Sequence, residues 1–345
     1  MNQHTNKRKN GCLWFFVLSV LSFFNFVIIK AVFLFSTSIS IFISVVISFI
    51  FLAMILGKFH LKTLIRSGVI IFLLFFGLKF IGNFLLVVLK TTHREKAVFN
   101  LDEKIIKSSV IEENDTISLY ASNRNWKDNY GNRYNAILSV RERDYLRLKN
   151  HIKSYKPPIR GYFWGNLYDY IDRKDTSSLD LIMEAFTKIN LQYNLNRMEF
   201  AEMIVSCIQD IPYSLVFVGE CKSAENYEKS IKKLLEDCPE CCIGNIKYGI
   251  QNPVSFIQNL KGDCDTRTVL LYSILKHFKY DIAIVNSEYY QHSILGINLP
   301  ASGLYKIHNG KKYILWETTA KYFKVGHLSP NFNNVTHWNV ILTSK

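Results

Sequence analysis

Three residues in the second half of the chain have the types and order of a nucleophilic thiol site. Cys264 follows Gly262-Asp263 at the start of an apolar helical pattern, and His292 and Glu317 lie downstream on two strand-like segments. A thiol becomes a nucleophile when a neighbouring base takes its proton. A carboxylate on the other imidazole nitrogen fixes the tautomer of that base. The three residues therefore predict acyl transfer through a thioester.

The apolar spacing after Cys264 predicts a helix that continues to Phe278. Asp263 is a suitable N-cap residue for this helix. The cysteine would then lie in the first turn, where backbone N–H groups and the helix dipole favour a thiolate. The same amides can stabilise an oxyanion, and the side chain of Gln258 is a candidate second donor.

The other two residues occupy strand ends. His292 opens the β-like run 293–297, and Glu317 ends the run 312–316. As general base, the histidine would take the thiol proton and later give a proton to the leaving amine. The alternatives are structural: the chain has nine histidines, a strand-end glutamate is common, and Cys264 can serve as a small buried hydrophobe.

Charged neighbours of the cysteine are expected to support it. Asp263 and Asp265 flank Cys264, and Arg267 follows one turn later. The arginine can pair with an aspartate and brace the loop, or it can meet a substrate carboxylate. Bracing by an aspartate is the favoured prediction.

Residues 250–326 resemble the core of the transglutaminase-like superfamily, whose catalytic domain is related to papain-type cysteine proteases. The resemblance rests on these segments: PVSF (253–256), KGDCD (261–265), YDIA (280–283), His292 with Gly296-Ile297, YILWETT (313–319) and KVGH (324–327). It implies an α+β fold in which a catalytic cysteine at a helix N-terminus packs on an antiparallel sheet. Cys264, His292 and Glu317 match the family's triad, although the family's acid is more often an aspartate.

The resemblance implies a thiol-dependent enzyme, and a peptidase or amidase acting on envelope protein is the expected function. A cross-linking transglutaminase, with a lysine amine as acceptor, shares the same Cys264 thioester. A non-catalytic, membrane-anchored binding module with a vestigial triad is the alternative of a different class. The expected partners are a protein or peptide substrate and the lipid bilayer. No cofactor, metal or nucleic acid is expected, and the oligomeric state is left open.

Four of the seven cysteines cluster ahead of this region: Cys221, Cys238, Cys241 and Cys242. In an oxidising compartment they would form two disulfides. A bond between the neighbours Cys241 and Cys242 is strained, so Cys221 is expected to pair with one of them and Cys238 with the other. A four-thiolate zinc site or a redox function is the alternative. Cys207 lies on an apolar helical stripe, where a buried free thiol is expected.

Residues 12–57 are almost entirely apolar, which is too long for one membrane span. Two spans near 12–35 and 38–57 are predicted, followed by a third near 68–89. A signal peptide is the alternative, but no small-residue cleavage site separates the first two apolar runs. Residues 1–92 are therefore predicted to be a membrane anchor.

Positive charges set the predicted orientation in the cytoplasmic membrane. Basic residues before the first span and in the 58–67 connection put both on the cytoplasmic side (Lys7, Arg8, Lys9, Lys58, Lys62 and Arg66). The catalytic domain would then be extracytoplasmic. Lys90, Arg94 and Lys96 lie on the side assigned as external and oppose this orientation.

The remaining chain is predicted to form an extracytoplasmic lead-in region, 93–174, and a transglutaminase-like domain, 175–345. The lead-in has β-like runs at 116–121 and 134–140, and the domain begins with helices near 178–190 and 197–210. The formal net charge is +14, but the basic residues are scattered singly, without a nucleic-acid motif.

Overall fold

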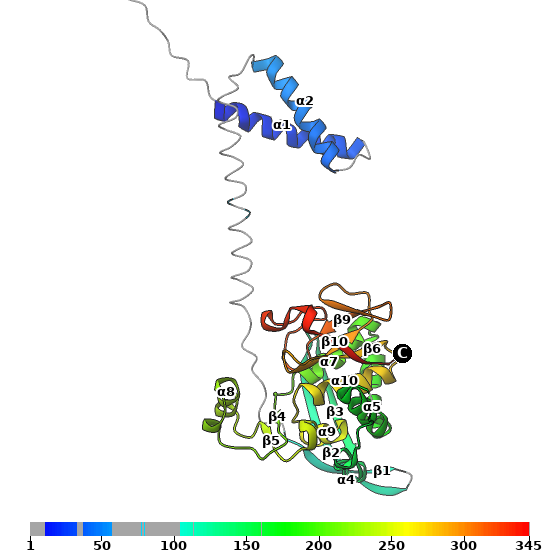
Figure 1. Cartoon of the computed structure of the whole chain (residues 1–345). Coiled ribbons are helices and arrows are strands. Elements are labelled where there is room, and N and C mark those ends of the chain that lie inside the picture. Colours follow the sequence, from blue (N-terminus) through cyan, green and yellow to red (C-terminus); the bar gives the residue numbers. More distant parts are fainter. Residues whose placement is uncertain are drawn as a thin grey trace, which may run out of the picture. The chain divides into compact units, whose positions relative to one another are not determined.

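The computed structural model describes residues 11–32, 37–56, 77, 79, 104–112, 114–159 and 161–344. The chain divides into two compact units, Met1–Glu95 and Lys96–Lys345 (Figure 1).

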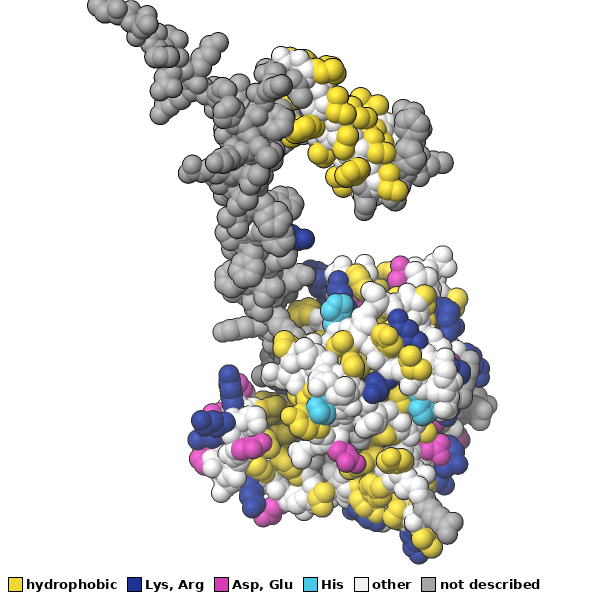
Figure 2. Space-filling model, turned by 45° about the horizontal axis from the view of Figure 1, so that its top comes forward, with side chains coloured by type: hydrophobic (Ala, Val, Ile, Leu, Met, Phe, Trp, Pro, Cys, Tyr) yellow, Lys and Arg dark blue, Asp and Glu magenta, His cyan; other side chains and the backbone are white. Residues whose placement is uncertain are grey.

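The described part of the first unit is mainly a pair of apolar helices, α1 (Gly11–Val32) and α2 (Thr37–Leu56), which pack against each other. Polar side chains join them, because Asn25 Nδ2 donates to Ser48 Oγ at 2.8 Å. Ser40, Ser44 and Ser48 recur every fourth residue of α2 and are buried. Large apolar side chains cover much of the visible surface of the pair (Figure 2).

The prediction of a three-span membrane anchor is wrong. Within the described residues, no helix combines the length and the apolar character that a membrane crossing requires. A span needs about 20 predominantly apolar residues, whereas hydroxyl side chains recur along both α1 and α2, and α1 also contains Asn25. The predicted multi-pass localisation, with an extracytoplasmic catalytic domain, is wrong for the same reason. The third predicted span, 68–89, lies outside the described residues except for 77 and 79.

The described part of the second unit has an α+β architecture with two main antiparallel sheets. The first sheet contains β1 (Ile106–Glu112), β2 (Asp115–Lys127) and β3 (Arg133–Arg141) in that order. The second has the order β10-β6-β7-β9-β8, and its strands are β6 (Ile282–Ser287), β7 (His292–Ile297), β8 (Tyr305–His308), β9 (Lys311–Trp316) and β10 (Asn339–Thr343).

Helices cover and connect these sheets. They are α4 (Glu142–Leu148), α5 (Phe163–Asp175), α6 (Asp180–Tyr193), α7 (Arg197–Gln209), α8 (Lys229–Asp237), α9 (Pro253–Asn259) and α10 (Cys264–His277). The helices predicted near 178–190, 197–210 and after Cys264 are confirmed as α6, α7 and α10. The predicted β-like runs lie in β2 and β3. Two short strands, β4 (Leu215–Val216) and β5 (Cys242–Ile243), pair in parallel.

Helix α10 lies at the centre of this unit. It packs on β6 and β7 of the second sheet and contacts α5, α7 and α9 (Figure 1). Most of its side chains are buried, and these include polar ones such as Arg267, Thr268 and Ser273 as well as apolar ones. The same core includes Trp126 and Leu138 from the β2–β3 hairpin and Tyr168 from α5. The lead-in segment thus contributes to the core around α10.

The surface of the second unit carries its positive charges singly. Figure 2 shows Lys and Arg side chains distributed among acidic and apolar ones on the visible face, and no large basic patch is seen there.

Candidate active site

Packing and capping fix the start of α10. A Cβ atom added to Gly262 would lie 2.6 Å from the Phe256 ring and 2.8 Å from Thr266, so the chain can turn here only with glycine. Asp263 is the N-cap, and its side chain accepts a hydrogen bond from Thr266 N at 3.0 Å. The predicted cap is confirmed. Cys264 is consequently the first residue of the helix, with its side chain 7% exposed.

Strand pairing brings the predicted base and acid together. β7 and β9 are neighbours, and Leu295 pairs with Trp316. His292 is the first residue of β7, and Glu317 directly follows β9. His292 Nε2 lies 3.0 Å from Glu317 Oε2. The extra methylene of glutamate, relative to aspartate, does not prevent the contact.

The carboxylate of Glu317 is buried and fully held. Its Oε1 accepts hydrogen bonds from Thr318 N at 2.9 Å, Thr319 N at 2.9 Å and Thr319 Oγ1 at 2.8 Å. Burial alone would raise its pKa, but His292 and the threonine donors lower the pKa to about 2. The acid is therefore ionised and can only accept hydrogen bonds.

These contacts define the state of the imidazole. Because the Glu317 carboxylate accepts, His292 carries a proton on Nε2, and its Nδ1 makes no hydrogen bond within the described residues. Burial would lower the pKa of His292, but Glu317, Asp265 and Asp263 outweigh it and raise the pKa above 6.5. The geometry leaves Nδ1 as the nitrogen for proton transfer.

The Cys264 thiol is held in its neutral form. Burial, followed by the charges of Asp265 and Asp263, raises its pKa well above the ordinary value of 9.0, while the backbone amide of Ser293 acts in the opposite direction. The predicted stabilisation of a resting thiolate by the helix N-terminus is therefore outweighed. Within the described site, no direct hydrogen bond joins the thiol to His292.

Asp265 joins three elements around the thiol. Its Oδ1 accepts hydrogen bonds from Tyr168 Oη on α5, at 2.7 Å, and from Ser293 Oγ on β7. Thr268 Oγ1 on α10 donates to Ser293 O at 3.2 Å. Sequence reasoning missed Tyr168 and Ser293. The tyrosine is 97 residues from Asp265, so no local spacing could reveal the contact.

Arg267 braces the site, but in a different way from the prediction. Its guanidinium donates to the backbone carbonyls of Gly262 at 3.0 Å, Ile208 at 3.0 Å, Ile211 at 2.9 Å and Pro212. No ion pair with an aspartate forms in the described structure. Burial lowers the pKa of Arg267 to about 10. The arginine ties the start of α10 to the end of α7 and to the segment after it.

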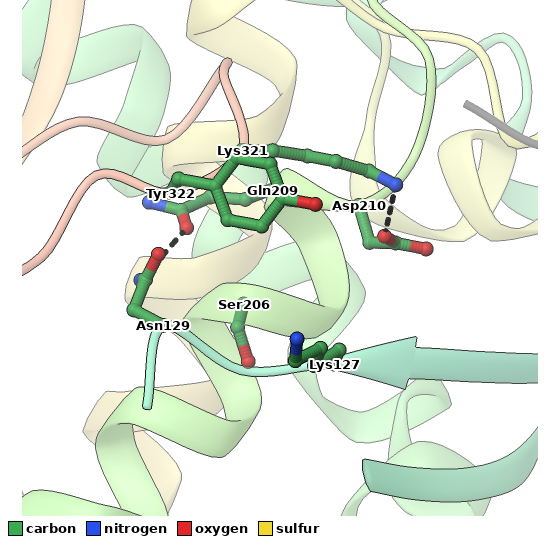
Figure 3. A pocket seen from close by; sticks show the side chains of 7 residues that line it. All are labelled: Lys127, Asn129, Ser206, Gln209, Asp210, Lys321 and Tyr322. Atoms are coloured by element: carbon green, nitrogen blue, oxygen red, sulfur yellow. Dashed lines mark hydrogen bonds and ion pairs between the residues drawn. The ribbon is translucent and has the colours of Figure 1, made fainter. Parts of the chain in front are cut away.

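Gln209, the last residue of α7, holds the backbone of Glu317 through hydrogen bonds. Its Nε2 donates to Glu317 O at 2.6 Å and to Phe323 O at 3.0 Å. Asn129 Nδ2 donates to Gln209 Oε1 at 3.4 Å (Figure 3). Figure 3 also shows the ion pair between Lys321 and Asp210, the residue that follows Gln209. The sequence did not identify Gln209, which lies 108 residues from Glu317.

Gln258, the predicted second oxyanion donor, is half-buried on α9, which packs against α10. Its side chain makes no hydrogen bond within the described residues.

A cavity of about 280 Å³ lies beside His292. The other residues that line it are Trp164, Asp265, Asn286, Ser287, Glu288 and Gln291. They come from α5, the start of α10, the end of β6 and the β6–β7 turn. A group bound in this cavity would lie next to the imidazole of His292.

The cysteine cluster forms two disulfides, Cys221–Cys242 and Cys238–Cys241. This confirms the prediction of two bonds and selects one of the two expected pairings. The four sulfurs are consumed in these bonds, so they cannot act as zinc thiolates. Cys207 is a buried free thiol on α7, as predicted. Among the described residues, no group of three or more His, Cys, Asp or Glu side chains could hold a metal ion.

Comparison with known proteins gives no match, whether with family models, curated proteins or solved structures. The resemblance to the transglutaminase-like superfamily therefore stays a prediction that rests on the motifs alone.

Proposed function

We propose that this protein is a thiol-dependent acyl-transfer enzyme that hydrolyses an amide bond of a peptide or protein. One observation carries the proposal: a buried cysteine at the first turn of α10 lies in the same site as a His292–Glu317 pair whose Nδ1 is unoccupied. The transglutaminase-like motifs support it from the sequence.

In the acylation step, His292 Nδ1 takes the proton of the Cys264 thiol as the sulfur attacks the substrate carbonyl carbon. A C–S bond forms, and the carbonyl oxygen becomes an oxyanion near the first amides of α10. The C–N bond then breaks, and the amine leaves with the proton from the imidazolium. The product of this step is a Cys264 thioester.

In the deacylation step, His292 takes a proton from water, which attacks the thioester carbonyl. The C–S bond breaks, the acid product leaves, and the thiol regains a proton from the imidazolium. Throughout, Glu317 accepts from Nε2 and stabilises the imidazolium without taking its proton.

The electrostatics favour this general-base route over a resting ion pair between a Cys264 thiolate and a His292 imidazolium. The raised pKa of Cys264 keeps the thiol protonated at rest, so the proton must move during the attack. The active histidine is consequently the neutral form, and activity depends on His292 being deprotonated.

Two alternatives use the same site. A lysine amine can replace water in deacylation, which gives cross-linking by the same thioester. A binding module with a vestigial triad is favoured by the missing hydrogen bond between Cys264 and His292. Catalytic hydrogen bonds often form only when substrate is bound, so the missing bond does not exclude the enzyme.

An activated ester tests the proposal without knowledge of the natural substrate. Mixing the protein with p-nitrophenyl acetate should release a burst of p-nitrophenolate equal to the protein concentration. Mass spectrometry should find one acetyl group on Cys264 that hydroxylamine removes. Cys264→Ala should abolish the burst, whereas Cys207→Ala, the matched free-thiol control, should retain it. A burst that survives in Cys264→Ala, or no burst in the native protein, rules out the enzyme.

A protein substrate then shows whether water or a lysine amine accepts the acyl group. Incubation with unfolded casein should give shortened peptides that depend on Cys264. High-mass conjugates instead of shortened peptides would identify cross-linking and overturn hydrolysis.

A further inference from the structure

The turn between β2 and β3 is hydrogen-bonded to the helix that holds the backbone of Glu317. Asn129 lies in this turn, and its backbone N donates to Glu202 Oε1 at 3.2 Å. Its Nδ2 donates to the same oxygen at 2.5 Å and to Gln209 Oε1 at 3.4 Å. Glu202 and Gln209 are seven residues apart on α7, so they lie on the same face two helical turns apart. The predicted lead-in region, 93–174, therefore reaches the residue that holds the acid.

The Asn129 amide fixes the orientation of the Gln209 amide. Gln209 Nε2 donates to Glu317 O at 2.6 Å and to Phe323 O at 3.0 Å, so Nε2 must face these two carbonyls. Its Oε1 faces the donor Nδ2 of Asn129 (Figure 3). With the Gln209 amide turned over, its oxygen would face two carbonyl oxygens and its NH₂ group would face another NH₂ group. The donor on Asn129 thus selects the orientation that holds Glu317.

The same two amides fasten the loop that carries the acid. Phe323 O accepts from Asn129 Nδ2 at 3.2 Å as well as from Gln209. One side chain, that of Gln209, thus binds the carbonyls at both ends of the segment from Glu317 to Phe323. Thr319, which donates to the Glu317 carboxylate through its backbone N and its hydroxyl, lies within that segment. The position of the carboxylate therefore depends on how the loop is held.

Glu202 destabilises the fold at this position. It is 1% exposed, and its Oε2 has no hydrogen-bond partner within the described part of the chain. Burial raises the pKa of Glu202 to about 7; the hydrogen bonds from Asn129 and the charge of Lys324 act against this, and the charge of Asp128 adds to it. A buried carboxyl with an unpaired oxygen costs free energy. Stability therefore does not explain Glu202, and an unsatisfied buried group of this kind calls for another function.

We propose that Asn129 and Glu202 are positioning residues for Glu317, which they orient through the amide of Gln209. Glu202 holds Asn129, Asn129 orients Gln209, and Gln209 holds the backbone of Glu317. The inference rests on the proposed function, because it assigns further residues to the acid of the same site. Through Glu317, the β2–β3 turn controls the proton affinity of His292.

The titration of His292 reports the position of Glu317 without requiring catalysis. Burial lowers the pKa of His292, but Glu317 raises it above 6.5, so a displaced carboxylate should let this pKa fall. The full chain is labelled with isotopic histidine, and its ring nitrogens are followed by NMR between pH 5 and 9. The signal that disappears in His292→Gln belongs to this residue. In Asn129→Ala its midpoint should move to lower pH.

The matched control is Asn132→Ala. Asn132 is exposed in the same turn, and its Nδ2 donates to Asp128 Oδ2 at 2.8 Å and not to α7. This variant also removes a side-chain hydrogen bond from the turn, but it should leave the His292 midpoint at its native value. An unchanged midpoint in Asn129→Ala, or equal shifts in both variants, overturns the positioning function.

Variants of Glu202 separate positioning from stability. Glu202→Leu removes the acceptor for Asn129, so the His292 midpoint should fall and the burst rate should drop about tenfold. Glu202→Gln keeps an accepting oxygen and should restore the midpoint that Glu202→Leu loses.

The free energy of unfolding provides the second measurement. Folding raises the pKa of Glu202 to about 7, so the native protein loses stability as the pH rises through this value. Neither variant carries the buried charge, so in urea at pH 8 neither should be less stable than the native protein. A loss of stability in Glu202→Leu that parallels its loss of activity would assign Glu202 a structural function and overturn the inference.

The two proposals fail in different ways. A shifted His292 midpoint in Asn129→Ala, without a p-nitrophenolate burst in the native protein, leaves the positioning of Glu317 and removes the enzyme. A Cys264-dependent burst with an unchanged midpoint in Asn129→Ala leaves the enzyme and removes the positioning function.

Discussion

The two free cysteines of the second unit, Cys207 and Cys264, lie in contrasting surroundings. Both are buried, and burial is the main cause of a raised pKa in each, to about 12 for Cys207. Cys207 lies within α7, where Arg124 Nη2 donates to its carbonyl at 3.2 Å. Cys264 begins α10 beside His292 and Glu317. Burial keeps both thiols protonated at rest. The difference between them is His292, which predicts nucleophilic chemistry at Cys264 and not at Cys207.

The largest expected effect comes from removing the base. In His292→Gln, the burst rate with p-nitrophenyl acetate should fall about 10³-fold, because general-base catalysis contributes about 10² to 10⁴. Alkylation of Cys207 by iodoacetamide, followed by peptide mapping in the same sample, should be unchanged. If the burst rate is unaffected, the two cysteines differ for a reason other than His292.

The pH profile sharpens the comparison. Activity needs neutral His292, so it should rise with pH through the pKa of this group, with a midpoint above 6.5 because Glu317 raises that pKa. In Glu317→Gln the midpoint should move to lower pH, and the plateau rate should fall about 10²-fold. Stopped-flow rates between pH 5 and 9 measure both changes. Cys207 alkylation should show no midpoint in this range, since its pKa is about 12.

A smaller loss is expected in Gln209→Ala. This change removes the donor to the Glu317 carbonyl, which orients the acid through its backbone. The burst rate should fall about tenfold, as is typical when a hydrogen bond that orients a functional side chain is removed. The midpoint of the pH profile should shift, and Ser206→Ala, three residues earlier on α7, is the matched control. A loss of thermal stability without a change in the profile would assign Gln209 a purely structural function.

The smallest effect on activity is expected in Cys207→Ala. The burst should keep its amplitude and rate. The free energy of unfolding, measured with urea, should fall by about 1–2 kcal/mol, because a buried side chain is shortened. A change in the burst would show that the two cysteines are coupled.

The parts of the site that depend on local sequence were predictable. Asp263 as cap and Cys264 as first helical residue follow from the spacing of a few neighbouring residues. The strain of joining Cys241 to Cys242 excluded one disulfide pairing but did not choose between the other two. His292 and Glu317 were identified as members of a motif, and strand pairing supplies the contact that the motif implies.

The remainder depends on tertiary packing that sequence spacing does not contain. Tyr168 and Gln209 reach the site across 97 and 108 residues. The Cys264 thiol was expected to ionise because the sequence places it at a helix N-terminus. The sequence does not show that the thiol is buried beside the charge of Asp265, and both effects raise its pKa. The membrane spans were inferred from the length of the apolar run 12–57. That length does not show that Asn25 and Ser48 bond to each other and join α1 to α2.

The contacts of Arg267 have a consequence for how the start of α10 is assembled. Its guanidinium binds the carbonyls of Ile208, near the end of α7, and Ile211, just beyond it, as well as that of Gly262 before Cys264. These contacts to Ile208 and Ile211 span 59 and 56 residues of the chain, so the start of α10 is secured only after α7 has docked. The first turn of α10 is therefore a product of long-range packing, and a disturbance at the end of α7 would be transmitted to Cys264.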